Sequence, residues 1–291
     1  MRFLILCIIS ITVLSCKKKE VEIPSYIHIE PFTFTATDAQ GGKTANITNG
    51  QVFIGNTFVG DYEFPITIPV NVAGDTVVSI FPSVKENGIS NGRKVYKLYE
   101  PHKEQVSLKR GLVDSVKPSS TYKQNVNFVW IEDFDDNAIS MEKGLTNSLF
   151  DSLETYPFTA TDAFKGSGKG FSGGVYFPVN SVGFIWEAIT VQEFLVPKKG
   201  KDVYVELDLK SDIAINIGVI YNLNNVLTQR DVVTFFPTGD VYKKLYINLE
   251  TEVSPLPDDL KVRLFFGGFN FTDSASTPKV FIDNLKLAYL Q

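Results

Sequence analysis

Cysteine, histidine and tryptophan are scarce in this sequence, and their scarcity excludes several kinds of site. The two cysteines, Cys7 and Cys16, both lie within the first sixteen residues. The rest of the chain therefore has no disulfide, no thiolate metal site and no cysteine nucleophile. The two histidines are His28 and His102. A histidine-ligated metal or a Ser-His-Asp triad is thus excluded from residue 126 onward.

An excess of basic charge and a long hydrophobic run are also missing. The chain has 28 Lys and Arg against 33 Asp and Glu, a formal net charge of −5. A mildly acidic chain whose one basic run is Lys17-Lys18-Lys19 lacks the charge pattern of a nucleic-acid binder. The N-terminal apolar stretch runs from Phe3 to Leu14. It is too short to cross a bilayer, because a spanning helix needs about 20 residues.

The first fifteen residues have the pattern of a secretory signal peptide. Arg2 gives a positive start, the apolar stretch follows, and a small residue precedes the break. Leu14-Ser15-Cys16 resembles the lipobox of bacterial lipoproteins, in which the cysteine is lipidated and becomes the mature N-terminus. The resemblance implies lipidation of Cys16, stable anchoring in a lipid bilayer through more than one acyl chain, and a place in the bacterial cell envelope. We expect the outer membrane, with the protein facing the periplasm or the cell surface.

Residues 16–22 are interpreted as a lipidated tether. Lys17-Lys18-Lys19-Glu20 has three interpretations: a basic contact with anionic headgroups, a sorting signal, or a solvated spacer. The sorting signal would resemble the short charged segment that follows the cysteine of Bacteroidota surface lipoproteins.

The remaining chain is long enough for two domains, and its composition favours β-sheets. It contains 23 Phe and 12 Tyr, with frequent β-branched residues. Short apolar alternations are broken by Gly, Asn, Asp and Pro throughout. The polar segment 118–125 predicts a linker between a first domain at 23–117 and a second at 126–291. A polar linker further predicts that few contacts join the two domains.

The first domain carries one distinct local unit, from Gln51 to Phe81. Gly55-Asn56 joins two apolar runs, which predicts a β-hairpin, and Pro65 and Gly74 punctuate the following strands. The spacing of these residues with Val52, Val59, Gly60 and Val77 resembles PEGA-type surface modules. That resemblance implies a small immunoglobulin-like β-sandwich of structural or adhesive use.

The second domain shows about eight further strands, which favour a jelly roll or a similar sandwich. They are expected at 174–177, 184–191, 203–209, 213–221, 232–236, 242–249, 262–267 and 280–289. The ending Val280 to Leu287, with Ile282-Asp283-Asn284 at its centre, resembles the closing strand of galactose-binding-like carbohydrate-binding modules. In such modules an acidic strand near the start lies beside the last strand, and Glu132-Asp133-Phe134 fits that position.

Two sets of candidate site residues follow. Glu132, Asp133, Asp135 and Asp283 offer oxygen ligands that suit a structural Ca²⁺, and the alternative is a solvated acidic turn. Trp186, Tyr176 and Tyr221 are candidate ligand-binding aromatics, since sugar binding stacks aromatic rings on the pyranose. Trp186 can equally be a core residue, because it alternates with Ile185 in an apolar strand.

The sequence thus predicts an all-β surface lipoprotein of two β-sandwiches that is not an enzyme. The favoured function is non-catalytic binding of a glycan or another cell-surface polymer. The alternative is a structural or adhesion component of an envelope protein assembly.

Overall fold

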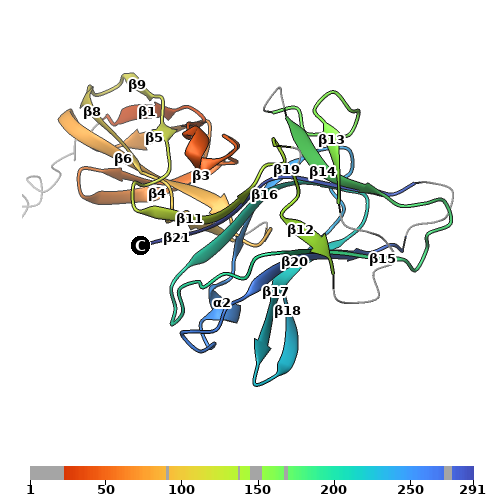
Figure 1. Ribbon diagram of the computed structural model, residues 1–291. Coiled ribbons are helices and arrows are strands. Elements are labelled where there is room, and N and C mark those ends of the chain that lie inside the picture. The colour runs from red at the N-terminus through yellow and green to blue at the C-terminus, as the bar shows by residue number, and fades with distance from the viewer. Residues whose placement is uncertain (1–22, 90–91, 137, 145–152, 167–169, 272–276) are drawn as a thin grey trace, which may run out of the picture.

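A computed structural model describes residues 23–89, 92–136, 138–144, 153–166, 170–271 and 277–291 (Figure 1). The predicted signal peptide, Cys16 and the tether lie outside these residues. The described chain is built of strands, with one 3₁₀ turn, η1 (Asp38–Gln40), and one short helix, α2 (Glu250–Val253). None of the described helices has the length and apolar character that crossing a bilayer requires. The predicted all-β fold is confirmed.

The first domain is a sandwich of two sheets. One sheet has the order β5 (Ile66–Val70), β1 (Ser25–Ile29), β9 (Val113–Val116). The other has the order β4 (Thr57–Glu63), β3 (Asn49–Ile54), β6 (Gly74–Lys85), β7 (Arg93–Val95), with β8 (His102–Leu108) also paired to β6. Alternate residues of both sheets fill the core between them, among them Ile27, Ile29, Val52, Ile80 and Leu108.

The predicted hairpin of the first domain is confirmed. Strands β3 and β4 pair antiparallel, with Ile54 opposite Thr57, so Gly55 and Asn56 form the turn. Gly55 has φ +58, in the left-handed region that glycine enters without a Cβ clash.

The second domain is a larger sandwich. Its first sheet has the order β13 (Glu154–Pro157), β14 (Phe171–Tyr176), β21 (Lys279–Leu290), β16 (Val203–Ser211), β19 (Lys243–Asn248), and β11 (Val126–Glu132) also pairs with β21. Its second sheet has the order β12 (Met141–Lys143), β15 (Ile185–Thr190), β20 (Arg263–Phe269), β17 (Ile215–Leu223), β18 (Val226–Phe235). Each of the eight predicted strands overlaps one of these strands. The expected pairing of the acidic first strand with the last strand is confirmed, because Glu132 lies opposite Leu285.

The segment 118–125 does not form a free linker. Strand β10 (Ser119–Ser120) pairs in parallel with β2 (Thr33–Phe34), and Tyr122 is buried. Aromatic residues of both domains pack into one cluster at the junction, with Tyr96, Tyr99 and Tyr122 meeting Tyr204 and Tyr246. The expectation of few contacts between the domains is therefore wrong.

A buried carboxylate joins the two domains at the centre of this cluster. Glu206 on β16 has no exposed surface, and its two oxygens accept hydrogen bonds from the hydroxyls of Tyr96 and Tyr122, each at 2.7 Å. Lys244 lies 3.2 Å from Glu206. Burial alone would raise the pKa of Glu206, but the charges of Lys244 and Lys286, together with the two tyrosine hydrogen bonds, hold the pKa below its usual value.

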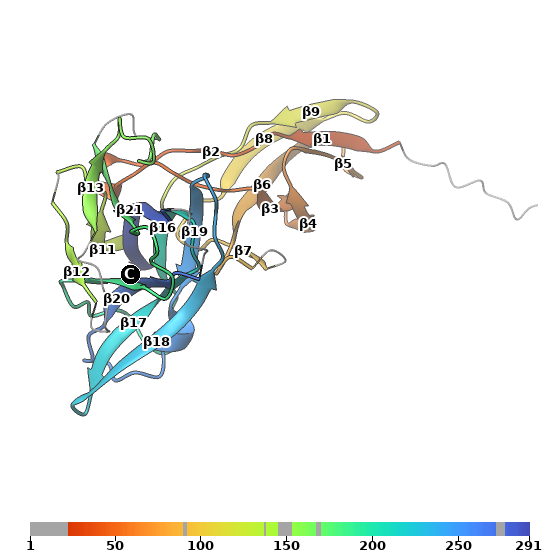
Figure 2. The same ribbon diagram turned by 90° about the vertical axis from the view of Figure 1, so that its right-hand side faces the viewer.

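The two ends of the molecule carry different elements (Figure 2). The start of β1 and the turn between β8 and β9 lie at one end, and the β17–β18 hairpin lies at the other. That hairpin turns at Asn224 and Asn225, whose φ values of 54° and 62° fit the two-residue turn that matches strand twist.

Candidate functional site

The outer face of the second sheet of the second domain carries a groove. Along β15 the side chains alternate, so that Trp186 and Ala188 enter the core while Glu187 faces outward. The groove measures about 350 Å³. It is lined by residues of four adjacent strands and the segments beside them: Ile185, Trp186, Glu187, Ala214, Asn216, Gln229, Thr234, Phe265, Gly267, Gly268, Phe269 and Phe271.

A polar row crosses the groove at right angles to the strands. The strand register places Glu187 opposite Gly267, Gly267 opposite Asn216, and Asn216 opposite Thr234. Gly267 has no side chain, so the row has a gap between Glu187 and Asn216.

Hydrogen bonds hold the polar side chains of the row in place. Gln229 Nε2 donates to Glu187 Oε2 at 3.0 Å. Thr234 Oγ1 donates to Asn216 Oδ1 at 2.7 Å, and Asn216 Nδ2 donates to Asp231 Oδ2 at 3.3 Å. The groove therefore presents amide, hydroxyl and carboxylate groups whose positions are fixed before any ligand arrives.

Two phenylalanines form an aromatic surface at one end of the groove. The ring centroids of Phe269 and Phe271 lie 4.1 Å apart with an interplanar angle of 38°. Phe271 is 79% exposed, and it lies against a second ring, that of Phe269. An exposed ring beside ordered polar groups suits a ligand that has both apolar and hydroxyl-bearing faces.

The three aromatic residues predicted to bind ligand do not come together in this groove. Trp186 has no exposed surface, and its ring packs in the core, so it offers no platform for a sugar. Tyr221 is also buried in that core. Tyr176 is exposed, but it lies on the other sheet, where its hydroxyl donates to Asp162 Oδ2 at 2.7 Å.

Sequence reasoning missed the groove residues Phe269, Phe271, Asn216 and Gln229. The alternation Phe269-Asn270-Phe271 directly after Gly267-Gly268 was an available signal, because it puts two rings on one face beside a stretch without side chains.

A second concave site lies between the domains. A cavity of about 310 Å³ is lined by the first-domain loop from Asp38 to Thr44 and by acidic residues of the second domain. Asp133, Asp135 and Asp283 are among its lining residues. The fold thus brings together three of the four residues predicted to hold Ca²⁺.

The predicted Ca²⁺ ligand set is not assembled, however. The carboxylate of Glu132 is occupied by protein donors: Phe134 N at 3.0 Å, Ser140 N at 2.6 Å and Ser140 Oγ at 2.5 Å. Within the described ranges, no group of three His, Cys, Asp or Glu side chains is arranged to hold one metal ion. Among the described residues, the four side chains predicted to hold Ca²⁺ therefore do not form one ligand set.

Asp283 has the most strongly raised pKa in this cavity. Burial raises its pKa to about 8, hydrogen bonds from Ser172 and the Asn284 backbone oppose the rise, and the charges of Asp208 and Asp135 add to it. Ser172 Oγ donates to Asp283 Oδ2 at 2.7 Å. Burial therefore shifts this carboxyl toward its protonated form.

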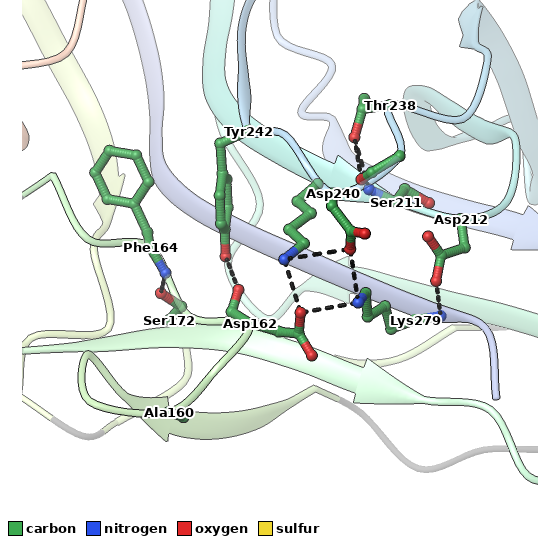
Figure 3. Close-up of polar contacts among 12 residues, drawn as sticks. Ala160, Asp162, Phe164, Ser172, Ser211, Asp212, Thr238, Asp240, Tyr242 and Lys279 are labelled. Carbon is green, nitrogen blue, oxygen red and sulfur yellow. Dashed lines mark hydrogen bonds and ion pairs between the residues drawn. The ribbon is translucent and has the colours of Figure 1, made fainter.

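A fixed loop forms one wall of the cavity (Figure 3). Asp162 accepts a hydrogen bond from Lys210 at 2.7 Å and makes an ion pair with Lys279 at 2.8 Å, while its carbonyl oxygen accepts from the Tyr242 hydroxyl. Burial would raise the pKa of Asp162, but the two lysines and the hydrogen bond from Tyr176 hold it well below its usual range. Phe164, which lines the cavity, donates its backbone N–H to Ser172 Oγ at 2.9 Å, and its ring packs against Tyr242.

Comparison with known sequences assigns this chain to no family. No family model matches it, and no curated protein sequence matches it. Among solved structures it is similar to the CBM22-2 xylan-binding domain of Paenibacillus barcinonensis Xyn10C, with 14% identity over 56% of this chain and 99% of that chain and a TM-score of 0.35.

Two further solved structures are similar to it. One is a carbohydrate-binding module of the β-sandwich superfamily described for promiscuous specificity, with 14% identity, 85% of this chain and 86% of that chain covered, and a TM-score of 0.39. The other is a CBM28 module specific for non-crystalline cellulose, with 14% identity, 51% and 86% coverage, and a TM-score of 0.36.

Proposed function

We propose that this protein is a lipid-anchored, non-catalytic glycan-binding protein of the bacterial cell envelope, with the glycan held in the groove of the second domain. The observation that carries the proposal is the exposed Phe269–Phe271 pair beside the ordered polar row of the groove. The anchor is Cys16, as the lipobox resemblance implies.

The chemistry of the groove suits a sugar. A pyranose ring has apolar C–H faces and a rim of hydroxyls that both donate and accept hydrogen bonds. Phe271 offers a broad apolar surface for such a face. Asn216 supplies an acceptor, and Gln229 and Asn216 supply amide donors for the rim, while Glu187, which is 4% exposed, accepts from Gln229 and holds it in place.

Binding is favoured over hydrolysis by the number of acidic groups. Glycoside hydrolysis requires two carboxyl groups that flank the scissile bond. Among the described residues that line the groove, Glu187 is the single carboxylate, and it accepts a hydrogen bond from Gln229. The groove therefore supports recognition without a second group for acid–base chemistry.

The test is a glycan array followed by calorimetric titration of the best ligand on the full mature chain. Burying a phenylalanine ring is worth about 1.5–3 kcal/mol, so Phe271→Ala should weaken binding roughly 10- to 100-fold. Phe58→Ala is the matched control, since Phe58 is an exposed phenylalanine of the first domain. Wild-type affinity in Phe271→Ala, with an unchanged melting temperature, would overturn the proposal.

The alternative, an adhesion or structural role, is favoured by one observation on the first domain. Phe53 packs against Phe58 at 5.2 Å and Phe81 at 5.4 Å on the outer face of the β4-β3-β6 sheet. Phe58 is half-exposed there, which gives an exposed aromatic patch suited to a protein partner. Two results together would favour this role. The wild-type protein would bind no glycan, and Phe58→Ala would lose the chemical crosslinks that the wild type forms to envelope proteins.

A further inference from the structure

Exposed apolar side chains gather at the end of the first domain where the described chain begins. Ile23 is 62% exposed, Leu112 is 56% exposed and Val113 is 58% exposed. Val72, in the turn between β5 and β6, is also exposed. Single exposed apolar residues are ordinary on a protein surface, but a contiguous group marks a contact site.

Hydrogen bonds show that these residues belong to one surface. Gly111 N donates to the Pro24 carbonyl at 2.9 Å, next to Ile23 and Leu112. Ser25 Oγ donates to the Val72 carbonyl at 2.7 Å. Both views of the fold place the start of β1 beside the β8–β9 turn (Figures 1 and 2). We call this group, Ile23, Val72, Leu112 and Val113, the apolar tip.

Basic side chains flank the apolar tip. Lys109 and Arg110 precede Leu112 in the same turn and are exposed. Arg110 Nη1 donates to the Ile23 carbonyl at 3.0 Å and to Asn71 Oδ1 at 3.3 Å, so its guanidinium lies on the apolar tip itself. Among the described residues at this end, Asp75 is an exposed acidic residue, and Asp114, which follows Val113, is half-buried. Apolar residues beside lysine and arginine are the composition that enters the headgroup region of anionic bilayers.

The short N-terminal segment between Cys16 and Ile23 limits how far the apolar tip can lie from a lipid attached to Cys16. Cys16 precedes Ile23 by seven residues, and a fully extended chain spans at most about 3.6 Å per residue. If Cys16 is lipidated, the apolar tip is therefore within roughly 25 Å of the bilayer surface. This step depends on the anchoring stated under the proposed function, and not on glycan binding.

We propose that the apolar tip rests on an anionic phospholipid surface, with Ile23, Leu112 and Val113 in the headgroup region and Lys109 and Arg110 on the lipid phosphates. This contact fixes the orientation of the protein relative to the membrane. The β17–β18 hairpin, which contributes to the groove, lies at the opposite end of the molecule (Figure 2) and then faces away from the bilayer.

The absence of cysteine after Cys16 allows a direct test with a single fluorescent label. A hexahistidine tag replaces residues 1–16 and holds the chain on vesicles of phosphatidylcholine, phosphatidylglycerol and a nickel-chelating lipid, so the result is independent of natural lipidation. An environment-sensitive NBD label is placed at Leu112→Cys or at Val226→Cys. Val226 is 62% exposed at the far end of the molecule and is the matched control.

We expect a blue shift of the Leu112 label on vesicles and its quenching by nitroxide lipids, with neither effect at Val226. In the chain labelled at Leu112, Val113→Asp with Arg110→Glu should restore the water-exposed emission, which shows that the tip and not the label drives insertion. A Leu112 label that stays in water on vesicles overturns the proposal. So does an equal blue shift without vesicles, because a second copy of the chain would then cover the tip.

Discussion

Replacing Asp283 by asparagine should change how the stability of this protein depends on pH. Asp283 is 4% exposed, and burial raises its pKa from 3.8 to about 8. In the unfolded chain the same carboxyl loses its proton near pH 4. Between these two pH values the folded protein holds one more proton at this position than the unfolded chain does.

The sign of the effect follows from this difference in bound protons. Stability falls with rising pH wherever the folded state binds the extra proton. The contribution of protonated Asp283 is fully present below about pH 4 and is lost as the pH rises through about 8. One proton corresponds to a slope of at most about 1.4 kcal/mol per pH unit.

An asparagine side chain cannot ionise, so Asp283→Asn should remove this slope, and the variant should be more stable than the wild type at pH 8. The substitution keeps a polar partner for Ser172 and for the Asn284 backbone. Urea unfolding of both proteins at pH 5, 6, 7 and 8 measures the difference in free energy of unfolding. Asp259→Asn, which removes an exposed carboxylate, controls for the change in net charge.

The free energies of unfolding of the wild type and of Asp283→Asn, plotted against pH, must converge toward low pH for the reasoning to stand. A difference between wild type and Asp283→Asn that is constant from pH 5 to pH 8 would refute it. A difference that favours the wild type more strongly at pH 8 would mean that Asp283 is ionised and stabilised by a bound cation.

Four further outcomes are expected. Glu206→Ala should destabilise the protein by about 3–5 kcal/mol in urea unfolding, because it leaves Lys244 buried without its partner; a loss below about 1 kcal/mol would contradict this. Melting curves with excess Ca²⁺ and with chelator should coincide, since no Ca²⁺ ligand set is assembled among the described residues; a gain of about 2.7 kcal/mol at a hundredfold excess over Kd would restore that site. Cys16→Ala should move the protein from the membrane fraction to the soluble periplasm, and persistent membrane association would argue against the anchor. The fragment 126–291 should melt at a lower temperature than the full chain, because Glu206 and Tyr246 lose the cover of the first domain; equal melting temperatures would show that the junction contributes nothing.

The order and approximate bounds of the strands could be predicted from the sequence alone. Alternation of apolar and polar residues has a period of two in a strand, and Gly, Asn and Pro mark the turns, so each element leaves a local signal. The Gly55-Asn56 turn and the pairing of the acidic first strand with the closing strand are examples. Sequence patterns also identified Asp133, Asp135 and Asp283 as neighbours, and in the structure all three line one cavity.

The tertiary structure decided which face of each strand enters the core. In Phe184 to Ile189 nearly every residue is apolar, so alternation does not say which face enters the core. The sandwich takes Trp186 inward and leaves Glu187 in the groove. A tryptophan that the sequence allowed as a sugar platform thus became part of the core.

The junction and the groove depend on residues that are far apart in the chain. Tyr96 and Tyr122 meet Glu206 across more than 80 positions, and no local pattern identifies such a buried carboxylate in advance. The groove joins Phe271 to Asn216 and Glu187 only because β15, β20 and β17 are neighbours in one sheet. Local sequence determines where a strand forms, whereas strand order and register determine which side chains share a surface.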